Sequence, residues 1–113
     1  MAYGRATRAK ILMERYRSGI INEPFRSNPR LLARSCAKAA IRVLSSITIL
    51  RGAIFYASPY QVVAMVTRYA PEATFLAYRA LEIVDGAMSE PNEAMGIAER
   101  AVELFYSLYP EPS

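Results

Sequence analysis

Residues 26–42 read RSNPRLLARSCAKAAIR, and a basic residue recurs at every fourth position of this stretch. On an α-helix a step of four residues turns the side chain by about 400°, so successive cations lag by about 40° and form a slowly curving line about 24 Å long. Like charges four residues apart repel each other and weaken a helix unless an anion faces them. The pattern therefore predicts a helix that turns one face toward a polyanion. We call these five residues the basic stripe: Arg26, Arg30, Arg34, Lys38 and Arg42.

Proline and glycine divide the rest of the chain into segments typical of helices. Three prolines come shortly after a residue that can cap a helix. Pro29 and Pro59 directly follow Asn28 and Ser58, and Pro91 lies two positions after Ser89. Gly19, Gly52 and Gly86 stand where helices can end. Alternation of period two with turn dipeptides, which marks strands, is absent. The predicted fold class is all-α, with helices over 5–18, 29–50, 59–70, 71–85 and 91–109.

Apolar residues in two of these segments follow the spacing of a buried helix face. They are Leu32, Cys36, Ala39, Val43, Ile47 and Leu50 in the first, and Ala94, Ile97, Ala101, Leu104 and Leu108 in the second. Residues 5–18 instead carry cations on two faces, with Arg5, Arg8 and Arg15 on one and Lys10 and Arg17 on the other. We expect a basic N-terminal helix-turn-helix arm followed by a small C-terminal helical bundle. Its parts are an arm helix and turn (1–28), a long basic helix continuing the arm (29–52) and an acidic bundle with a short tail (53–113).

The net charge of +4 conceals two halves of opposite sign. Residues 1–52 hold eleven Lys or Arg and two Glu, a net charge of +9, whereas residues 53–113 hold three Arg and eight acids, a net charge of −5. Twelve of the 14 cations are Arg, whose planar guanidinium binds phosphate in a bidentate manner. A solvated helix face is the ordinary explanation of such charges, but only Glu14 and Glu23 are near enough to neutralise them. Nucleic acid is therefore favoured, because neutralising phosphates releases counterions.

Several function classes find no support in the composition. The densest apolar stretch, AIRVLSSITIL, is far shorter than the ~20 residues of a membrane span, and the opening MAYGRATRAK predicts no secretory signal. The chain has no histidine and a single cysteine, Cys36, so we expect neither a disulfide nor a metal site. The carboxylates of Glu99 and Glu103 are typical of a solvated face, and no phosphate-binding glycine loop occurs. We expect no enzyme and no cofactor.

The eight tyrosines do not alternate with the cations, as stacking on single-stranded nucleic acid would require. Only Tyr3 and Tyr16 lie in the basic half. We expect the others to form core or subunit contacts: Tyr56, Tyr60, Tyr69, Tyr78, Tyr106 and Tyr109.

The N-terminal motifs resemble the opening of the major capsid proteins of filamentous and rod-shaped archaeal double-stranded DNA viruses (rudiviruses, lipothrixviruses and tristromaviruses). The matching words are Gly4-Arg5-Ala6-Thr7-Arg8, Arg15-Tyr16, and Phe25 followed by Ser27-Asn28-Pro29, with Arg26 inserted after the phenylalanine. The resemblance covers about the first 40 residues. It implies dimers whose helix-turn-helix arms wrap linear double-stranded DNA in the A-form, inside a shell of helical bundles.

The resemblance implies that Arg5, Arg8, Arg15 and Asn28 lie in the DNA-wrapping arm. The charge pattern itself adds Lys10, Arg17, Arg26, Arg30, Arg34, Lys38 and Arg42 as candidate DNA-binding residues. The expected function is a virion coat protein that packages DNA without sequence specificity into a helical filament. Its expected partners are double-stranded DNA, itself or a paralogous coat protein in a homo- or heterodimer, neighbouring subunits, and an envelope where one exists. The expected location is the virion, and the host cytoplasm during assembly.

The same charges are compatible with two alternative functions. A chromatin protein or helix-turn-helix regulator would read the major groove with polar side chains, but LLARSCAKAA (31–40) offers few of them. A membrane-surface or protein-interaction module could also use basic residues. A membrane helix, however, would need a large apolar face with aromatic residues opposite the charges.

Overall fold

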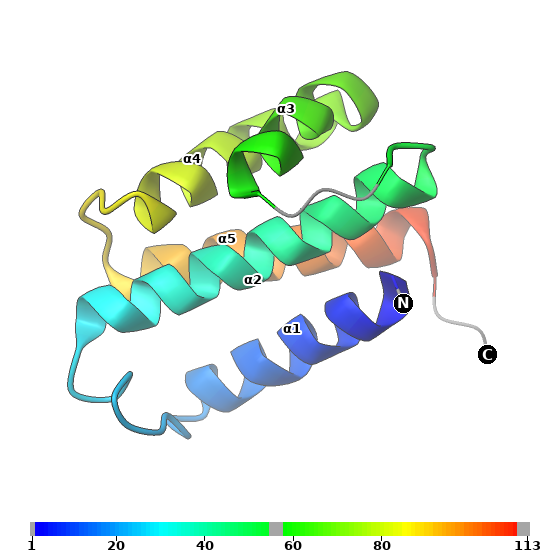
Figure 1. The fold of residues 1–113 in the computed structure, drawn as a ribbon. Helices are drawn as coiled ribbons and strands as arrows, with labels where there is room; N and C mark the ends of the chain where they lie inside the picture. Colours follow the sequence, from blue (N-terminus) through cyan, green and yellow to red (C-terminus); the bar gives the residue numbers. More distant parts are fainter. Residues whose placement is uncertain (1, 55–57, 111–113) are drawn as a thin grey trace.

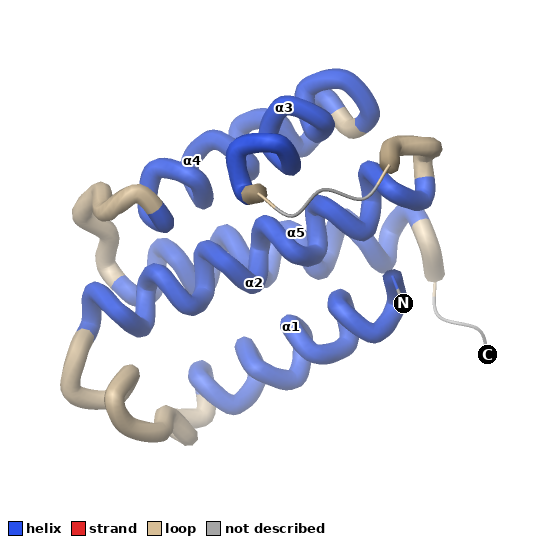
Figure 2. The backbone as a smooth tube through the Cα atoms, in the orientation of Figure 1, coloured by secondary structure: helices blue, strands red, loops and turns tan. Residues whose placement is uncertain are grey.

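The structure, a computed structural model, describes residues 2–54 and 58–110, which form helices joined by short connections (Figure 2). The helices are α1 (Ala2–Arg17), α2 (Pro29–Leu50), α3 (Pro59–Tyr69), α4 (Thr74–Val84) and α5 (Pro91–Leu108). A short 3₁₀ helix, η1 (Pro71–Ala73), precedes α4. No strand occurs within the described ranges, and the predicted all-α class is confirmed for them. Tyr56 and the end of the predicted tail lie outside those ranges.

Helix α2 is the centre of the molecule, with α1 on one side, α3 and α4 on the other and α5 behind it (Figure 1). Thirteen of its 22 residues are buried. Fully buried alanines, including Ala37 and Ala40 on α2 and Ala98 and Ala101 on α5, allow these two helices to approach closely. Because α2 is covered on most of its circumference, only a narrow strip of it reaches solvent.

The helix starts follow from local chemistry. The Asn28 side chain accepts a hydrogen bond from the Leu31 amide (3.2 Å), which satisfies one of the free N–H groups at the start of α2. At α3, the Ser58 hydroxyl accepts from the Tyr60 amide, while the Ser58 amide donates to the Gln61 side chain (3.2 Å each). These two predicted starts are confirmed.

Some details differ from the sequence expectations. Helix α1 already includes Ala2, and the segment predicted as a helix from residue 71 begins as the 3₁₀ turn η1. Leu50, predicted in the core, is 43% exposed because it lies in the last turn of α2, just before the chain turns at Gly52. Leu104 and Leu108 are half-buried, whereas the other predicted core positions of α2 and α5 are buried.

Helix α1 is packed on α2 and α5, whereas the sequence pattern predicted an arm apart from the bundle. Ala6, Ala9, Met13 and Tyr16 are buried against these helices at three- and four-residue spacing. Two of the four are alanines and one is a tyrosine, so this face carries a weak hydrophobic signal. Ile11, two residues before the buried Met13, is 51% exposed. In the single chain, α1 therefore shares one hydrophobic core with the bundle.

The Phe105 ring should be the most costly side chain to remove. It is fully buried and lies within 5.2–5.5 Å of the rings of Tyr3, Tyr106 and Tyr109, so it joins α1 to α5. We expect Phe105→Ala to lower the free energy of unfolding by about 3–5 kcal/mol in urea titrations followed by circular dichroism. Phe75→Ala is the matched control, because Phe75 is 83% exposed, and should change it by less than about 0.5 kcal/mol. Equal losses would contradict this packing.

Candidate nucleic-acid interface

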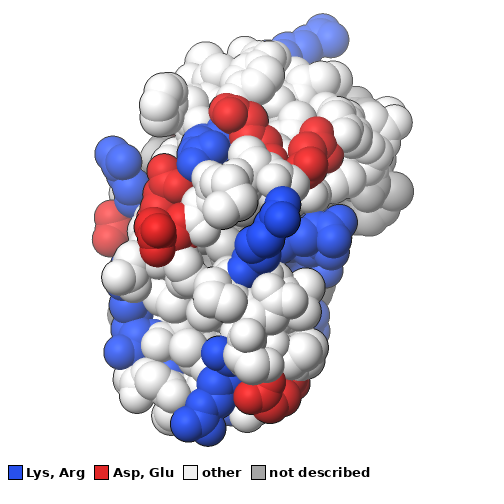
Figure 3. All heavy atoms as spheres, turned by 90° about the vertical axis from the view of Figure 1, so that its left-hand side faces the viewer, with Lys and Arg blue, Asp and Glu red and all other residues white. Residues whose placement is uncertain are grey.

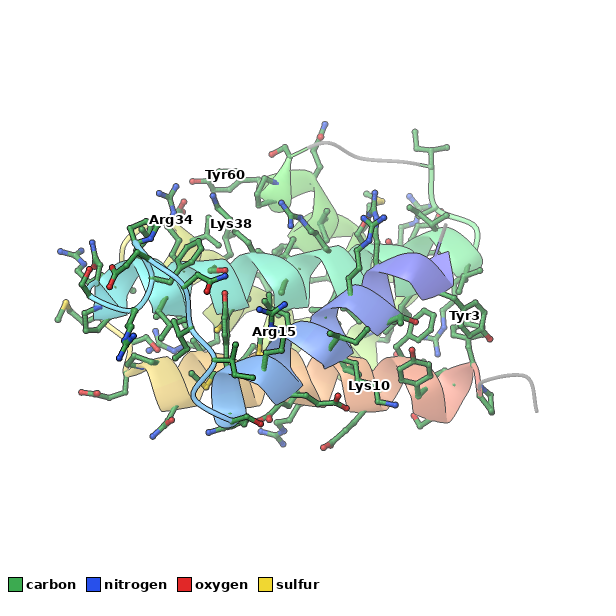
Figure 4. All side chains as sticks on the ribbon, turned by 90° about the horizontal axis from the view of Figure 1, so that it is seen from below. Tyr3, Lys10, Arg15, Arg34, Lys38 and Tyr60 are labelled. Atoms are coloured by element: carbon green, nitrogen blue, oxygen red, sulfur yellow. The ribbon has the colours of Figure 1, made fainter. Side chains whose placement is uncertain are left out.

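Most of the basic stripe lies on the solvent strip of α2 or in the turn before it. Arg34, Lys38 and Arg42 are exposed on α2, and Arg26 is exposed in the turn between α1 and α2. Figure 4 shows Arg34 and Lys38 on the same side of the helix. None of these four cations forms a hydrogen bond or ion pair with a described residue. Their charge is therefore available to an external anion.

The start of α2 is different, because its polar groups already have partners. The Arg30 guanidinium donates to the Gly86 carbonyl (3.0 Å), and Asn28 serves as the cap. A hollow of about 410 Å³ beside these residues is also lined by Arg34 and by Asp85, whose carboxylate offsets the local positive charge. The Asp85 carboxylate accepts from the Tyr60 hydroxyl (2.7 Å), and this bond raises the pKa of Tyr60.

The cations of α1 point to two sides of the helix, as their spacing predicted. Arg5 and Arg8 face α2, and Arg15 is exposed about two turns beyond Arg8 on the same helix (Figure 4). Lys10 lies on the α5 side, where its ammonium nitrogen is 5.5 Å from the centre of the Tyr106 ring. The α1 residues thus divide into a group facing α2 and a group facing α5.

Arg17 anchors the C-terminal end of α1 to α5. Its guanidinium makes two hydrogen bonds to the Glu99 carboxylate (2.7 and 3.0 Å) and a third to the Asn92 side-chain oxygen (3.3 Å). Donation to the Glu99 carboxylate raises the pKa of Arg17. Both partners remain partly exposed, so the pair contributes only about 1 kcal/mol or less. Arg17 was predicted to bind DNA, but its guanidinium is already occupied by a carboxylate.

A groove between α1 and α2, with a volume of about 650 Å³, brings four of the predicted residues together. We call it the α1–α2 groove. One wall carries Arg5 and Arg8, and the other carries Lys38 and Arg42. Its apolar lining comes mainly from Ala9, Leu12, Ala39, Ile41 and Val62, and its remaining residues are Ser45 and Pro59. No acidic residue is part of this lining.

Ser45 is a part of this groove that the sequence reading missed. The Arg5 guanidinium donates to the Ser45 hydroxyl (3.3 Å), which ties the two walls together at one point. Ser45 follows Lys38 by seven residues and therefore lies on the same helix face, so its spacing could have identified it. Pro59 and Val62 come from α3, and no local pattern could have placed them here.

Cys36 is fully buried on α2, near Arg17 at the end of α1 and Glu99 on α5. The Tyr16 hydroxyl is 3.5 Å from the hydroxyl of Ser35, which immediately precedes Cys36. Burial raises the pKa of the Cys36 thiol to about 12, and the positive charge of Arg17 partly opposes this shift. The thiol is therefore an internal reporter of whether α1 stays in place, because a thiol reagent reaches it only when the cover opens.

Acidic side chains of residues 53–113 are more often paired than the cations of the basic stripe. Arg51 makes two hydrogen bonds to Glu72 (2.8 and 2.9 Å), and Arg79 makes two to Glu93 (2.8 and 3.3 Å). These hydrogen bonds lower the pKa of Glu72 and of Glu93. Figure 3 shows one end of the molecule, where most acidic side chains lie in the upper part and basic side chains lie on both edges and below.

Over residues 2–54 and 58–110, no three acidic, cysteine or histidine side chains come together in a way that could hold a metal ion. Among the helices described, none has the length and apolar character that crossing a membrane requires.

Comparison of the chain with protein-family models, with curated proteins and with solved structures gives no match.

The Arg17 anchor predicts a measurable effect on Cys36. Arg17→Ala should increase the rate at which N-ethylmaleimide modifies Cys36 by about fivefold, since it removes a contact worth about 1 kcal/mol that holds α1 down. Arg15→Ala is the matched control, because Arg15 is exposed two residues away without such a contact, and should leave the rate unchanged. The rate is measured by mass spectrometry on the folded protein. Equal rates in the two variants would show that the Arg17–Glu99 pair does not hold the helix.

Proposed function

We propose that the protein is a structural coat protein that binds linear double-stranded DNA without sequence specificity and packages it into a helical filament. The observation that carries this proposal is the set of exposed cations, without acidic partners among the described residues, on two adjacent helices and the turn between them. They are Arg8 and Arg15 on α1, Arg26 in the turn, and Arg34, Lys38 and Arg42 on α2. Such a surface gains free energy by releasing counterions from any duplex.

The side chains favour phosphate contacts over reading of bases. Arginine binds phosphate in a bidentate manner regardless of sequence, and five of these six cations are arginine. Asn28, which could otherwise read adenine, is engaged as the cap of α2. A helix-turn-helix regulator is therefore less well supported than a coat, which must bind every sequence.

We propose that α1, the turn over residues 18–28 and α2 act as the helix-turn-helix arm that the N-terminal motifs imply. The two helices lie side by side and run in opposite directions (Figure 1). Arg8 lies across the α1–α2 groove from Lys38 and Arg42, and Arg15 is exposed further along α1. The two helices can therefore lie along a duplex without separating. Enclosing DNA between such surfaces would remove water from it, which favours the A-form.

Assembly into a filament requires contacts between copies, and α4 offers a candidate surface for a second copy of this chain. Phe75 is 83% and Tyr78 51% exposed on the outer face of α4, where Glu82 lies next to them along the helix. Exposed aromatic residues of this kind are typical of interfaces. The acidic half of one copy is complementary to the basic half of the next, and a head-to-tail contact that does not close builds a filament.

We propose further that the coat unit is a dimer, either of this chain or of this chain with a paralogous coat protein. The assembled protein would be located in the virion and would occur in the host cytoplasm during assembly. An envelope around the filament is compatible with this role, and no residue argued above depends on one.

Salt dependence is the first test of the DNA-binding proposal. Fluorescence anisotropy with several random-sequence duplexes should give similar affinities that fall steeply between about 50 and 200 mM salt. Arg15→Ala with Arg34→Ala should weaken binding to all duplexes alike and reduce the slope of log K against log salt by about two, one for each lost phosphate contact. Arg100→Ala, on the exposed face of α5, is the matched control and should have little effect. Loss of affinity for one sequence alone would contradict the proposal.

The role of α4 is tested by adding a negative charge to its exposed aromatic residue. Phe75→Asp should prevent filament formation on long DNA, as seen by electron microscopy, because it places a charge in the contact between copies. It should leave the affinity for a duplex of one binding site close to that of the control. Thr67→Asp, which adds the same charge to the exposed face of α3, is that control and should still form filaments. Filaments of Phe75→Asp would exclude α4 as the subunit contact.

A further inference from the structure

The α1–α2 groove holds three cations that have no acidic partner among the described residues, Arg8 on one wall and Lys38 and Arg42 on the other. Arg5 and Arg8 stand on one wall and Lys38 and Arg42 on the other, and the lining includes no carboxylate. Cations on opposite walls repel each other and so oppose the docking of α1. An anion bound between the walls would reverse this, because both walls would then attract it.

The floor of the groove limits what kind of anion fits. It is apolar but built partly from the small residues Ala9 and Ala39, so it offers contact for a sugar ring more readily than a deep pocket for an acyl chain. The Arg5–Ser45 hydrogen bond fixes one cation in position before any ligand arrives. Preorganised cations bind phosphate with a smaller loss of side-chain entropy.

The positive charge also continues beyond the groove. Toward the turn, Arg15 follows Arg8 on α1 and Arg34 precedes Lys38 on α2, and both are exposed. A single small anion would not use this extension, whereas a chain of phosphates would. The arrangement is thus suited to a polyanion whose backbone enters the groove and continues along both helices.

We infer that the α1–α2 groove is the seat of the DNA backbone, whose phosphates bridge Arg8 on one wall and Lys38 and Arg42 on the other and thereby hold α1 against the bundle. This inference rests on the proposed function. It adds that DNA binding holds α1 against the bundle. An arm that opened to wrap the duplex would instead move α1 away from the bundle. The two mechanisms have opposite consequences for the cover over Cys36.

The experiment follows the modification of Cys36 by N-ethylmaleimide, an uncharged reagent that DNA does not repel, in the full chain with and without saturating random-sequence linear duplex. Bound duplex should slow the reaction by about fivefold or more, within the usual range of coupling between two sites. Arg8→Ala with Lys38→Ala removes one cation from each wall and should abolish this protection at saturating duplex. Arg68→Ala with Arg100→Ala removes the same charge from exposed positions on α3 and α5, outside the groove and the DNA-binding cations, and should retain it.

The outcomes are separable. Faster modification in the presence of duplex would show that α1 lifts away and would overturn the inference while leaving DNA binding intact. Equal protection in both double variants would show that the groove is not the bridge. Protection by vesicles of anionic phospholipid but not by duplex would overturn it in favour of a membrane surface. Failure of the unmodified chain to bind duplex at low salt would reject both the inference and the proposed function. Thermal unfolding of each variant verifies that it is folded.

Discussion

Repulsion along one face of α2 is the constraint on which the rest of the structure depends. Like charges four residues apart each cost an isolated helix about 0.2–0.5 kcal/mol, so α2 would be weakened if it stood alone. Its remaining surface offsets this cost, because burial of a single Leu, Ile or Val side chain contributes about 1.5–3 kcal/mol. Leu44, Val43 and Ile47 are fully buried among the surrounding helices. The bundle therefore holds Arg34, Lys38 and Arg42 in a fixed line, which a free basic helix could not do.

The contact of α1 with the bundle is less apolar than that of α2. Its contact with α2 and α5 uses two alanines, a methionine and a tyrosine, together with the partly exposed Arg17–Glu99 ion pair. These contacts bury less apolar surface than a face of leucines would, while cations on both sides of the α1–α2 groove oppose them. The helix is thus positioned to respond to an anion that neutralises the groove.

Features that depend on neighbouring residues in the chain could be predicted from the sequence. The starts of α2 and α3 follow from Asn28-Pro29 and Ser58-Pro59, and the 40° lag of the basic stripe follows from its four-residue spacing. The docking of α1 could not be predicted, because Ala6 and Ala9 carry little hydrophobic signal and their partners are distant in the chain. The same holds for the occupation of Arg17 by Glu99, 82 residues away, and for the contribution of α3 to the groove. Local spacing predicted which cations are candidates for DNA binding, but only the packing shows which of them already have partners.

Electron microscopy of the purified protein mixed with linear random-sequence duplex, with circular dichroism of the same sample, tests the central claim most directly. The coat proposal predicts uniform helical filaments along the whole DNA and a dichroism band that shifts toward the A-form. Scattered particles on DNA that stays in the B-form, or binding to one sequence only, would contradict packaging and favour a regulator. Absence of any complex at low salt would mean that the exposed cations of α1 and α2 serve a partner other than DNA.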